Sequence, residues 1–399
     1  MQQQEISKLC LRVITPINIS DGTILGAKDY LYDPKKQKAY FLNIHAWHKF
    51  IYEHKLLQDY EDYIIKDRKN NLLTWLKGKN FSIDDVSSVI INVADVKVNT
   101  LDVTKKQTAN DIHRHIRHLD GKLYIPGSSI KGVFRTAILY NLLQKKKKIK
   151  EAYWQQVEQK KEILRKAFDE KANPRNIQIK DVKDAGKSLE RMAQRMETEL
   201  LHTLIIKDTE NGNVVCSAMR GLQVSDSYAS KNLQTAVLQK VDGGLDRYDK
   251  ASQHAISVFR ECMLPRTELY FDVKLEKAFT ATIGINSIDE LLDITRQFFK
   301  AVFDLLEKAF GNEYKKEFAE ITSANMFIGA NTGFLSKTLI AMLAPNGEKA
   351  KDVIKVLLQN SFKDHKHIIK DKKISPRTLK CTRYDGKLFI MGAAEVRKV

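Results

Sequence analysis

Cysteine is scarce in this sequence, and its positions exclude two kinds of small structural site. The four cysteines, Cys10, Cys216, Cys262 and Cys381, lie far apart in a chain of 399 residues and form no CxxC pair. This spacing excludes a zinc ribbon and a disulfide framework. Scattered free cysteines are typical of a reducing compartment, so we expect a cytoplasmic location.

Long hydrophobic runs are also missing. The longest apolar pieces, such as 339–344, fall far short of the roughly 20 residues that a membrane-spanning helix needs. The first residues, MQQQEISKLC, contain no apolar signal core, and the chain shows no basic amphipathic anchor. We therefore expect neither export nor a membrane partner.

What the chain has in excess is positive charge. It contains 67 Lys and Arg residues against 49 Asp and Glu, which gives a formal net charge of +18. Because 43% of its residues are hydrophobic, the composition is that of a folded protein rather than a disordered one. A charge excess of this size favours a polyanionic partner. Without a membrane anchor, that partner is predicted to be nucleic acid.

The motif IPGSSIKGVFRTAIL predicts a tight turn followed by a helix. Gly127 is expected to form the turn, and Ser128 or Ser129 to cap the helix, which leaves free N–H groups at its start. Lys131 and Arg135 then lie four residues apart on one helix face. Such a helix start suits a phosphate group, although the GK[ST] of a Walker loop is absent. The alternative is a capped helix that only packs on a sheet.

A second segment, FIGANTGFLSKTLI, repeats this chemistry with a different spacing. It places Gly329, Gly333, Ser336 and Lys337 at a predicted helix start. Glycines, a hydroxyl and a lysine together again suit a phosphate group. The sequence thus predicts two phosphate-binding loops.

A basic stretch, KKQTANDIHRHIRH, leads into the first motif. Its histidines suggest a metal site, but no cysteine or well-placed carboxylate completes one, so no metal is expected. The functional prediction for His113, Arg114, His115 and Arg117 is contact with RNA. A solvated basic face is the alternative.

Three further regions differ in composition. Residues 141–200 carry 16 Lys or Arg against 10 Asp or Glu and predict a basic helical insertion. Residues 231–260, with Gly243-Gly244 and the pair Asp246-Arg247, predict a loop region that reaches along a partner. An aromatic stripe at helical spacing in 287–318 predicts a buried helix pair.

Three blocks together resemble the RAMP superfamily of CRISPR effector proteins. They are IPGSSIKGVFRTAIL, the SDS…DR…ECMLPRTELYFDV block and FIGANTGFLSKT. The similarity runs from Leu11 to Lys337 and does not clearly cover 141–200. The first block indicates only the superfamily, whereas the third favours the subunit-5 family of type III-A (Csm) complexes. The tail 351–383, with ten Lys or Arg against three Asp, matches nothing that we can assign.

The resemblance implies an α+β fold. It has a modified ferredoxin-like (RRM/RAMP) core with large helical insertions and a β-hairpin thumb. The implied regions are a core in 1–140 and 201–285, a thumb near 225–260, and a helical and glycine-loop region in 286–399 that closes on the core. Because the RRM aromatic signature is absent, RNA contact should rest on charge and loops rather than on stacking.

The resemblance also implies a function without a cofactor. The subunit would cap the 3′ end of the guide RNA (crRNA) and aid complex assembly and crRNA maturation. Its partners would be crRNA, target RNA, other Csm subunits, especially the repeated backbone subunit, and host nucleases that trim the crRNA. The residues that match the loop meeting the guide backbone are Gly127, Ser128, Ser129, Lys131 and Arg135, and those that match the second glycine loop are Gly329, Gly333 and Lys337. Asp246 and Arg247 match the thumb region, where Arg247 is predicted to contact RNA.

The alternative is a RAMP-type endoribonuclease that acts on guide or target RNA. LGAKD places Asp29 where the target-cutting backbone subunit has its aspartate, and metal-assisted cleavage would need that carboxylate. The flanking proline is replaced here, which favours a turn-capping role. His113 or His115 could act as general acid or base, but neither has a defined partner. We expect a binding protein rather than an enzyme.

Overall fold

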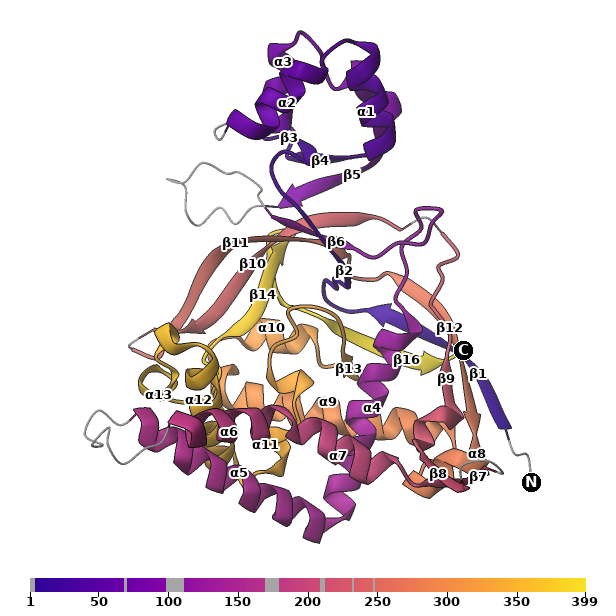
Figure 1. Ribbon diagram of the computed structural model, residues 1–399, viewed down its shortest axis with the longest axis vertical. Coiled ribbons are helices and arrows are strands. Elements are labelled where there is room, and N and C mark those ends of the chain that lie inside the picture. Colours follow the sequence, from indigo (N-terminus) through magenta and orange to yellow (C-terminus); the bar gives the residue numbers. More distant parts are fainter. Residues whose placement is uncertain are drawn as a thin grey trace.

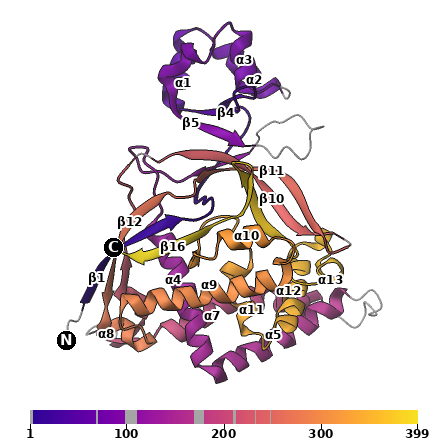
Figure 2. The same ribbon diagram turned by 180° about the vertical axis from the view of Figure 1, so that it is seen from behind.

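The computed structural model shows an α+β protein built from a small helical lobe and a larger body (Figure 1, Figure 2). The body contains two curved sheets and a layer of long helices. Among the described residues, no helix is long and apolar enough to cross a membrane. The structure describes residues 4–67, 70–97, 111–168, 179–208, 212–231, 233–246 and 248–399.

The first sheet is the ferredoxin-like core that the resemblance implies. Its strands lie in the order β13–β16–β1–β12–β9, and neighbouring strands are antiparallel. They are β13 (Met326–Phe327), β16 (Ala393–Lys398), β1 (Gln4–Val13), β12 (Glu268–Glu276) and β9 (Leu222–Val224). Helix α4 (Gly127–Lys145) lies between β1 and β9 in the chain, and α9 (Ile288–Phe310) between β12 and β16. This is the split β-α-β-β-α-β arrangement.

Residues from the region 286–399 therefore complete the core. Helix α9 is its second helix and packs against α4, while β16 pairs with β1. The aromatic stripe of α9 is buried, as predicted, and Ser287 caps the helix by accepting the Glu290 N–H at 3.1 Å. The helix pair predicted over 287–318 is confirmed as α9 and α10 (Lys315–Glu320).

The predicted insertion is helical and packs against the same core. Val157, Leu164 and Met196 are fully buried in the main hydrophobic cluster. An ion pair between Lys161 and Asp352, 2.9 Å long, ties the insertion to the C-terminal region. Its helices are α5 (Lys147–Phe168), α6 (Ile179–Glu190) and α7 (Met192–Leu201).

The second sheet follows the order β2–β6–β11–β10–β5–β4–β3, and β14 pairs with both β10 and β15. Its strands are β2 (Ser20–Leu25), β3 (Tyr30–Asp33), β4 (Lys38–Leu42), β5 (Ile90–Lys97), β6 (Ile112–His115), β10 (Thr235–Leu245), β11 (Ala251–Met263), β14 (Leu379–Tyr384) and β15 (Lys387–Ile390). Strands β10 and β11 form a long hairpin, which matches the thumb that the resemblance implies.

The loop predicted over 231–260 is therefore wrong. Gly243 and Gly244, taken as turn residues, lie inside β10 opposite Gln253 and Ser252. A side chain at Gly243 would come within 3.2 Å of the Tyr314 hydroxyl. The Gly244 N–H donates to that hydroxyl at 2.9 Å. These glycines thus make room for an aromatic side chain instead of forming a turn.

The helical lobe stands on β3, β4 and β5 and has its own aromatic cluster (Figure 1). Asn43 and Asn71 cap its first and third helices. Trp47 is almost completely buried among Phe50, Tyr60 and Trp75. The lobe contains α1 (Ile44–Glu53), α2 (Leu57–Lys66), α3 (Leu72–Gly78) and η1 (Asp84–Val89).

Short elements complete the body. Residues 204–208 and 212–216 pair as an antiparallel hairpin. The other elements are β7 (Leu204–Asp208), β8 (Gly212–Cys216), η3 (Ala218–Gly221), α8 (Lys277–Thr280), η4 (Ala281–Ile283), η5 (Leu335–Lys337), α11 (Ile340–Leu343), α12 (Gly347–Ser361), η6 (Lys363–His365) and α13 (His367–Lys370).

Candidate nucleic-acid interface

A buried asparagine joins the second glycine loop to the strands of the second sheet. The Ala330 N–H donates to the Asn18 carbonyl at 2.7 Å. The Asn18 side-chain amide donates to the Glu261 carbonyl at 2.8 Å and accepts from the Arg260 guanidinium at 3.2 Å. Because Asn18 is fully buried, the loop has a fixed position relative to β11.

Gly329 is required at the start of this loop for two reasons. Its φ of +94° lies in the left-handed region, and an added Cβ would lie 2.5 Å from the Asn18 carbonyl oxygen. Gly333 also has a positive φ, of +87°. The Ser336 hydroxyl bonds within the loop, to the Thr332 carbonyl at 3.0 Å. The helix start predicted here is only the short 3-10 turn 335–337.

Two cations beside this loop lack a carboxylate partner. Arg260 and Lys337 form no ion pair with any residue that the structure describes. Burial lowers the pKa of Arg260, and desolvation followed by the charge of Arg260 lowers the pKa of the exposed Lys337. Burial, then Arg260, likewise lowers the pKa of His113. Mutual repulsion among close cations means that an added anion would be stabilised here.

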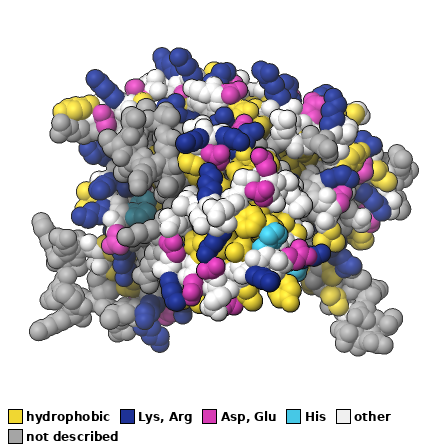
Figure 3. All heavy atoms as spheres, turned by 90° about the horizontal axis from the view of Figure 1, so that it is seen from above, with side chains coloured by type: hydrophobic (Ala, Val, Ile, Leu, Met, Phe, Trp, Pro, Cys, Tyr) yellow, Lys and Arg dark blue, Asp and Glu magenta, His cyan; other side chains and the backbone are white. Residues whose placement is uncertain are grey.

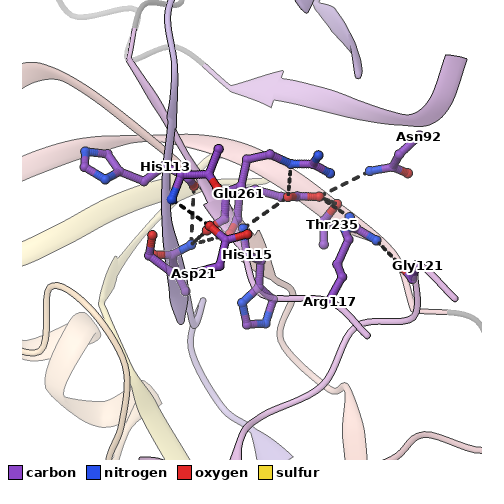
Figure 4. Close-up of polar contacts among 12 residues, drawn as sticks. Asp21, Asn92, His113, His115, Arg117, Gly121, Thr235 and Glu261 are labelled. Carbon is purple, nitrogen blue, oxygen red and sulfur yellow. Dashed lines mark hydrogen bonds and ion pairs between the residues drawn. The ribbon is translucent and has the colours of Figure 1, made fainter. Parts of the chain in front are cut away.

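The arginines of the basic stretch behave differently, because a buried carboxylate neutralises them (Figure 4). Glu261 has no exposed surface, and its carboxylate is bonded by the Arg117 guanidinium. Arg114 lies 3.6 Å from the same carboxylate and stacks over the Phe41 ring at 4.5 Å. Thr235 donates a further bond of 3.0 Å. Arg114 and Arg117 therefore have a structural role, because they balance the charge of the buried Glu261 carboxylate.

His115 lies inside the protein and cannot reach RNA in this conformation. It has no exposed surface, and its Nδ1 lies 3.0 Å from the Ile19 nitrogen and 2.8 Å from the Ile19 oxygen. Burial lowers its pKa to about 4. His113, two residues earlier on β6, is only partly buried.

The first glycine loop is fixed against the end of β9. The Gly127 N–H donates to the Asp226 carboxylate at 2.7 Å, and the Ile125 N–H donates to the Ser227 hydroxyl at 2.7 Å. A Cβ on Gly127 would lie 2.3 Å from the Val224 carbonyl oxygen. Glycine is needed here for close packing, and not for the positive φ that the sequence suggested.

The predicted serine cap of α4 is wrong. Pro126 holds the N-cap position, and Ser128 and Ser129 both lie in the first helical turn. Asp226 replaces the serine cap by accepting one of the N–H groups that a phosphate was expected to meet. Ser129 N–H donates to the Pro126 carbonyl instead.

The two cations of this helix also differ from each other. Arg135 forms an ion pair with Glu197, 3.2 Å long. Lys131 has no ion pair within the described ranges, and burial, then the charge of Arg135, lowers its pKa. Lys131 is therefore the cation of this motif that remains available to a phosphate.

The remaining candidate residues lie apart from these loops. The Asp29 carboxylate accepts the Gly26 N–H at 2.7 Å and closes the turn that contains it. Asp246 accepts backbone N–H groups at the tip of the β10–β11 hairpin, whereas Arg247 lies outside the described residues. Within the described ranges, no three His, Cys, Asp or Glu side chains come together as a metal site.

Sequence reasoning missed the three residues that organise this interface: Asn18, Arg260 and Glu261. Asn18 and Arg260 lie in ordinary strand or turn patterns that no motif marks, and Glu261 opens the ECMLPRTELYFDV block without a role that the block assigns to it. Only the pairing of β6 with β11 brings Glu261 to the arginines. Seen from the lobe end, Lys and Arg side chains are spread over the surface among acidic ones (Figure 3). The charge on this face therefore does not mark a single binding surface.

The fold and the two glycine loops define the class of the protein. The model of the RAMP superfamily matches residues 10–334. The chain therefore belongs to the RAMP superfamily.

Relatives within the superfamily narrow this assignment. The chain is 22% identical over 413 aligned residues to the CRISPR system Cms protein Csm5 of Mycobacterium tuberculosis (strain ATCC 25618 / H37Rv), which covers 98% of this chain and 96% of the relative. It is 25% identical over 150 residues to the Csm5 protein of Enterococcus italicus, covering 34% of this chain and 43% of that relative.

Solved structures show the same fold. A chain in the cryo-EM structure of a Csm–crRNA–target RNA ternary complex of a type III-A CRISPR-Cas system superposes with a TM-score of 0.62 at 19% identity, covering 98% of this chain and 100% of that chain. The crystal structure of Csm5 from T. onnurineus gives a TM-score of 0.52 at 15% identity, over 88% and 94% of the two chains.

Proposed function

We propose that this protein is the Csm5-type subunit of a type III-A CRISPR ribonucleoprotein. The observation that carries the proposal is the correspondence with a relative named Csm5 over 98% of this chain and 96% of that protein. The solved neighbour is part of a complex with crRNA and target RNA. In this role the protein binds guide RNA and holds it in the assembly.

Three cations support binding through the RNA backbone. Arg260, Lys337 and Lys131 form no ion pair within the described part of the chain. Desolvation lowers the pKa of all three, and a neighbouring arginine lowers the pKa of Lys337 and Lys131 further. Phosphates would relieve this repulsion. Contacts of this kind fix the position of a nucleic acid without reading its sequence, as a subunit that accepts many different guides requires.

The finer role in this proposal is a cap on the 3′ end of the crRNA. The subunit would also aid assembly beside the repeated backbone subunit and assist crRNA maturation, with trimming by host nucleases in the cytoplasm. The two glycine loops support the end-capping role, because they are held rigidly by Asn18 and Asp226. A rigid loop loses little conformational freedom when it binds a single RNA end.

The test is the identity of the RNA that the protein retains. The protein is co-expressed with the other complex subunits and a CRISPR array, and the co-purified RNA is sequenced. Repeat-derived guides should dominate, and a Lys337→Glu/Arg260→Glu variant should give a complex with more heterogeneous guide 3′ ends. Bulk cellular RNA, or unchanged 3′ ends in the variant, would contradict the proposal.

We also propose that the protein binds RNA without cutting it. The Asp29 carboxylate is engaged by the Gly26 N–H. Burial, then the charge of Arg260, lowers the pKa of His113, which disfavours the protonated form that a general acid needs. Labelled guide precursor and target RNA are incubated with the protein, with and without divalent metal. Cleavage that is lost in Asp29→Ala or His113→Ala would establish the ribonuclease alternative instead.

A further inference from the structure

A cavity of about 330 Å³ opens between α9, α12 and the segment 372–375. Its volume is at the lower end of the roughly 300–1,000 Å³ of small-molecule sites. The inner wall is apolar and includes Leu305, Leu335 and Ile374. Leu335 belongs to the second glycine loop, two residues before Lys337. The cavity therefore borders the second glycine loop at this one residue.

The rim of this cavity is strongly basic. Its charged lining consists of four lysines and one glutamate: Lys308, Lys351, Lys372, Lys373 and Glu348. Lys351 pairs with Glu348 at 2.5 Å, and Lys373 pairs with Asp249 at 3.4 Å. Lys308 and Lys372 are exposed and form no ion pair with a residue of the described ranges. An apolar wall under a rim with an excess of positive charge suits a ligand that is flat and apolar at one end and anionic at the other.

A buried carboxylate fixes the rim. Asp371 has no exposed surface and accepts hydrogen bonds from Ser375 at 2.6 Å and Arg377 at 2.7 Å. The His367 ring lies 2.8 Å from the same carboxylate. The short segment that carries Lys372 and Ile374 is therefore held from both sides.

An exposed basic strip leads to the cavity. Lys363, Lys366 and Lys370 are exposed on the segment that precedes the rim. This segment lies beside the tip of the β10–β11 hairpin in both views, and the Lys373–Asp249 ion pair joins them (Figure 1, Figure 2). The tip adds Lys250 and Tyr248, which are also exposed. A cationic track with an exposed aromatic ring is typical of surfaces that bind single-stranded nucleic acid.

We propose that this cavity binds one unstacked nucleotide of a single-stranded RNA that runs along the strip 363–373. The base lies against Leu305, Leu335 and Ile374, and Lys308 and Lys372 contact its phosphate. This site is separate from the phosphate contacts of the two glycine loops and does not depend on the identity of the complex. It gives a function to the basic tail, which lies beyond the residues that the family model matches.

A glycine at the cavity offers a sharp test. Gly347 is exposed in the first turn of α12, has no positive φ, and has only Leu305 within 4 Å of an added Cβ, at 3.9 Å. Gly347→Leu should fill the cavity without strain. Gly78→Leu is the matched control, because Gly78 is also exposed in a helix and has nothing within 4 Å.

The probe is a set of short single-stranded RNAs, each with 2-aminopurine at one position. One position should change fluorescence on binding to the native protein and to Gly78→Leu, but not to Gly347→Leu. Affinity should fall about fivefold in Gly347→Leu and in an RNA that is abasic at that position. Lys372→Glu should reduce affinity further than Lys36→Glu, an exposed control.

Three results would overturn the proposal. They are a fluorescence change that survives in Gly347→Leu, an abasic RNA that binds as well as the intact one, and a Gly347→Leu defect that appears only in binding another protein subunit. Lys337→Glu, which removes a glycine-loop cation, should weaken binding but leave the position-specific signal at saturation. If Lys337→Glu abolished the position-specific signal at saturation, the cavity would not act independently of the second glycine loop.

Discussion

At the scale of single residues, pairing with a carboxylate decides which cations remain available to an anion. Arg114 and Arg117 share the buried Glu261, whereas Arg260 and Lys337 form no ion pair within the described ranges. Removing one partner of a buried ion pair leaves the other charge unsatisfied and is costly. The paired arginines are therefore expected to stabilise the fold, and the unpaired cations to bind phosphate.

Substitution of the unpaired cations should weaken RNA binding. Lys337→Ala and Arg260→Ala should each lower affinity for single-stranded RNA about three- to tenfold, the loss of one charge-assisted contact. Each should also reduce the slope of log affinity against log salt by about 0.7. Fluorescence anisotropy titrations over a range of salt concentrations measure both quantities. Lys36→Ala is the control, and equal losses in all three variants would contradict the assignment.

His115 should make stability fall in mild acid. Its pKa is about 4 in the folded protein against 6.5 for the free side chain. Between pH 6.5 and pH 4, the unfolded chain therefore binds a proton that the folded chain does not bind. The free energy of unfolding falls as the pH falls through this range. At 1.36 kcal/mol per pKa unit, the total loss of unfolding free energy is about 3 kcal/mol. Denaturant unfolding at several pH values measures it, with His115→Gln as reference. Parallel pH curves for the two proteins would show that His115 contributes nothing.

At the scale of elements, close packing decides the form of the two glycine motifs. Pro126 and Gly127 start α4 as the sequence indicates, but the helix start is held by Asp226 and packed on Val224. The second motif forms only a short 3-10 turn, because its backbone is bonded to Asn18 rather than continued as a helix.

Two glycines of α4 should respond oppositely to alanine. Gly127→Ala places a Cβ 2.3 Å from the Val224 oxygen and should destabilise the protein by about 1–3 kcal/mol. Gly132→Ala meets nothing within 4 Å and should stabilise the helix by up to about 1 kcal/mol. Chemical denaturation of both variants is the measurement. Similar effects at both positions would show that packing against β9 does not decide the need for Gly127.

At the scale of the whole molecule, the core is assembled from both ends of the chain. Strand β16 lies between β1 and β13, and its Val396 N–H donates to the buried Asn325 at 2.8 Å. The segment that follows the family match is thus required to complete the sheet. The basic tail 351–383, which runs from α12 into β14, is held at both ends by these elements.

Removal of the last strand should therefore unfold the body. Deletion of 393–399 leaves β1 with an unpaired edge and removes buried apolar side chains such as Val396. We expect loss of cooperative thermal unfolding and poor recovery of folded protein. Lys398→Ala removes only partly exposed ion pairs and should cost less than about 1 kcal/mol. A deletion variant that still unfolds cooperatively would show that β16 is dispensable.

The sequence by itself predicted a polyanionic partner and determined most helices and strands and the two glycine motifs with their cations. These depend on composition, periodicity and local turn chemistry, which a single chain displays directly. Only the tertiary structure decided which cations remain unpaired, since Glu261 and Asn18 lie far from them in sequence and meet them through strand pairing. The tertiary structure also decided that residues 231–260, predicted as a loop, contain a hairpin. The space that Gly243 leaves for Tyr314 exists only after the C-terminal region has folded onto the sheet.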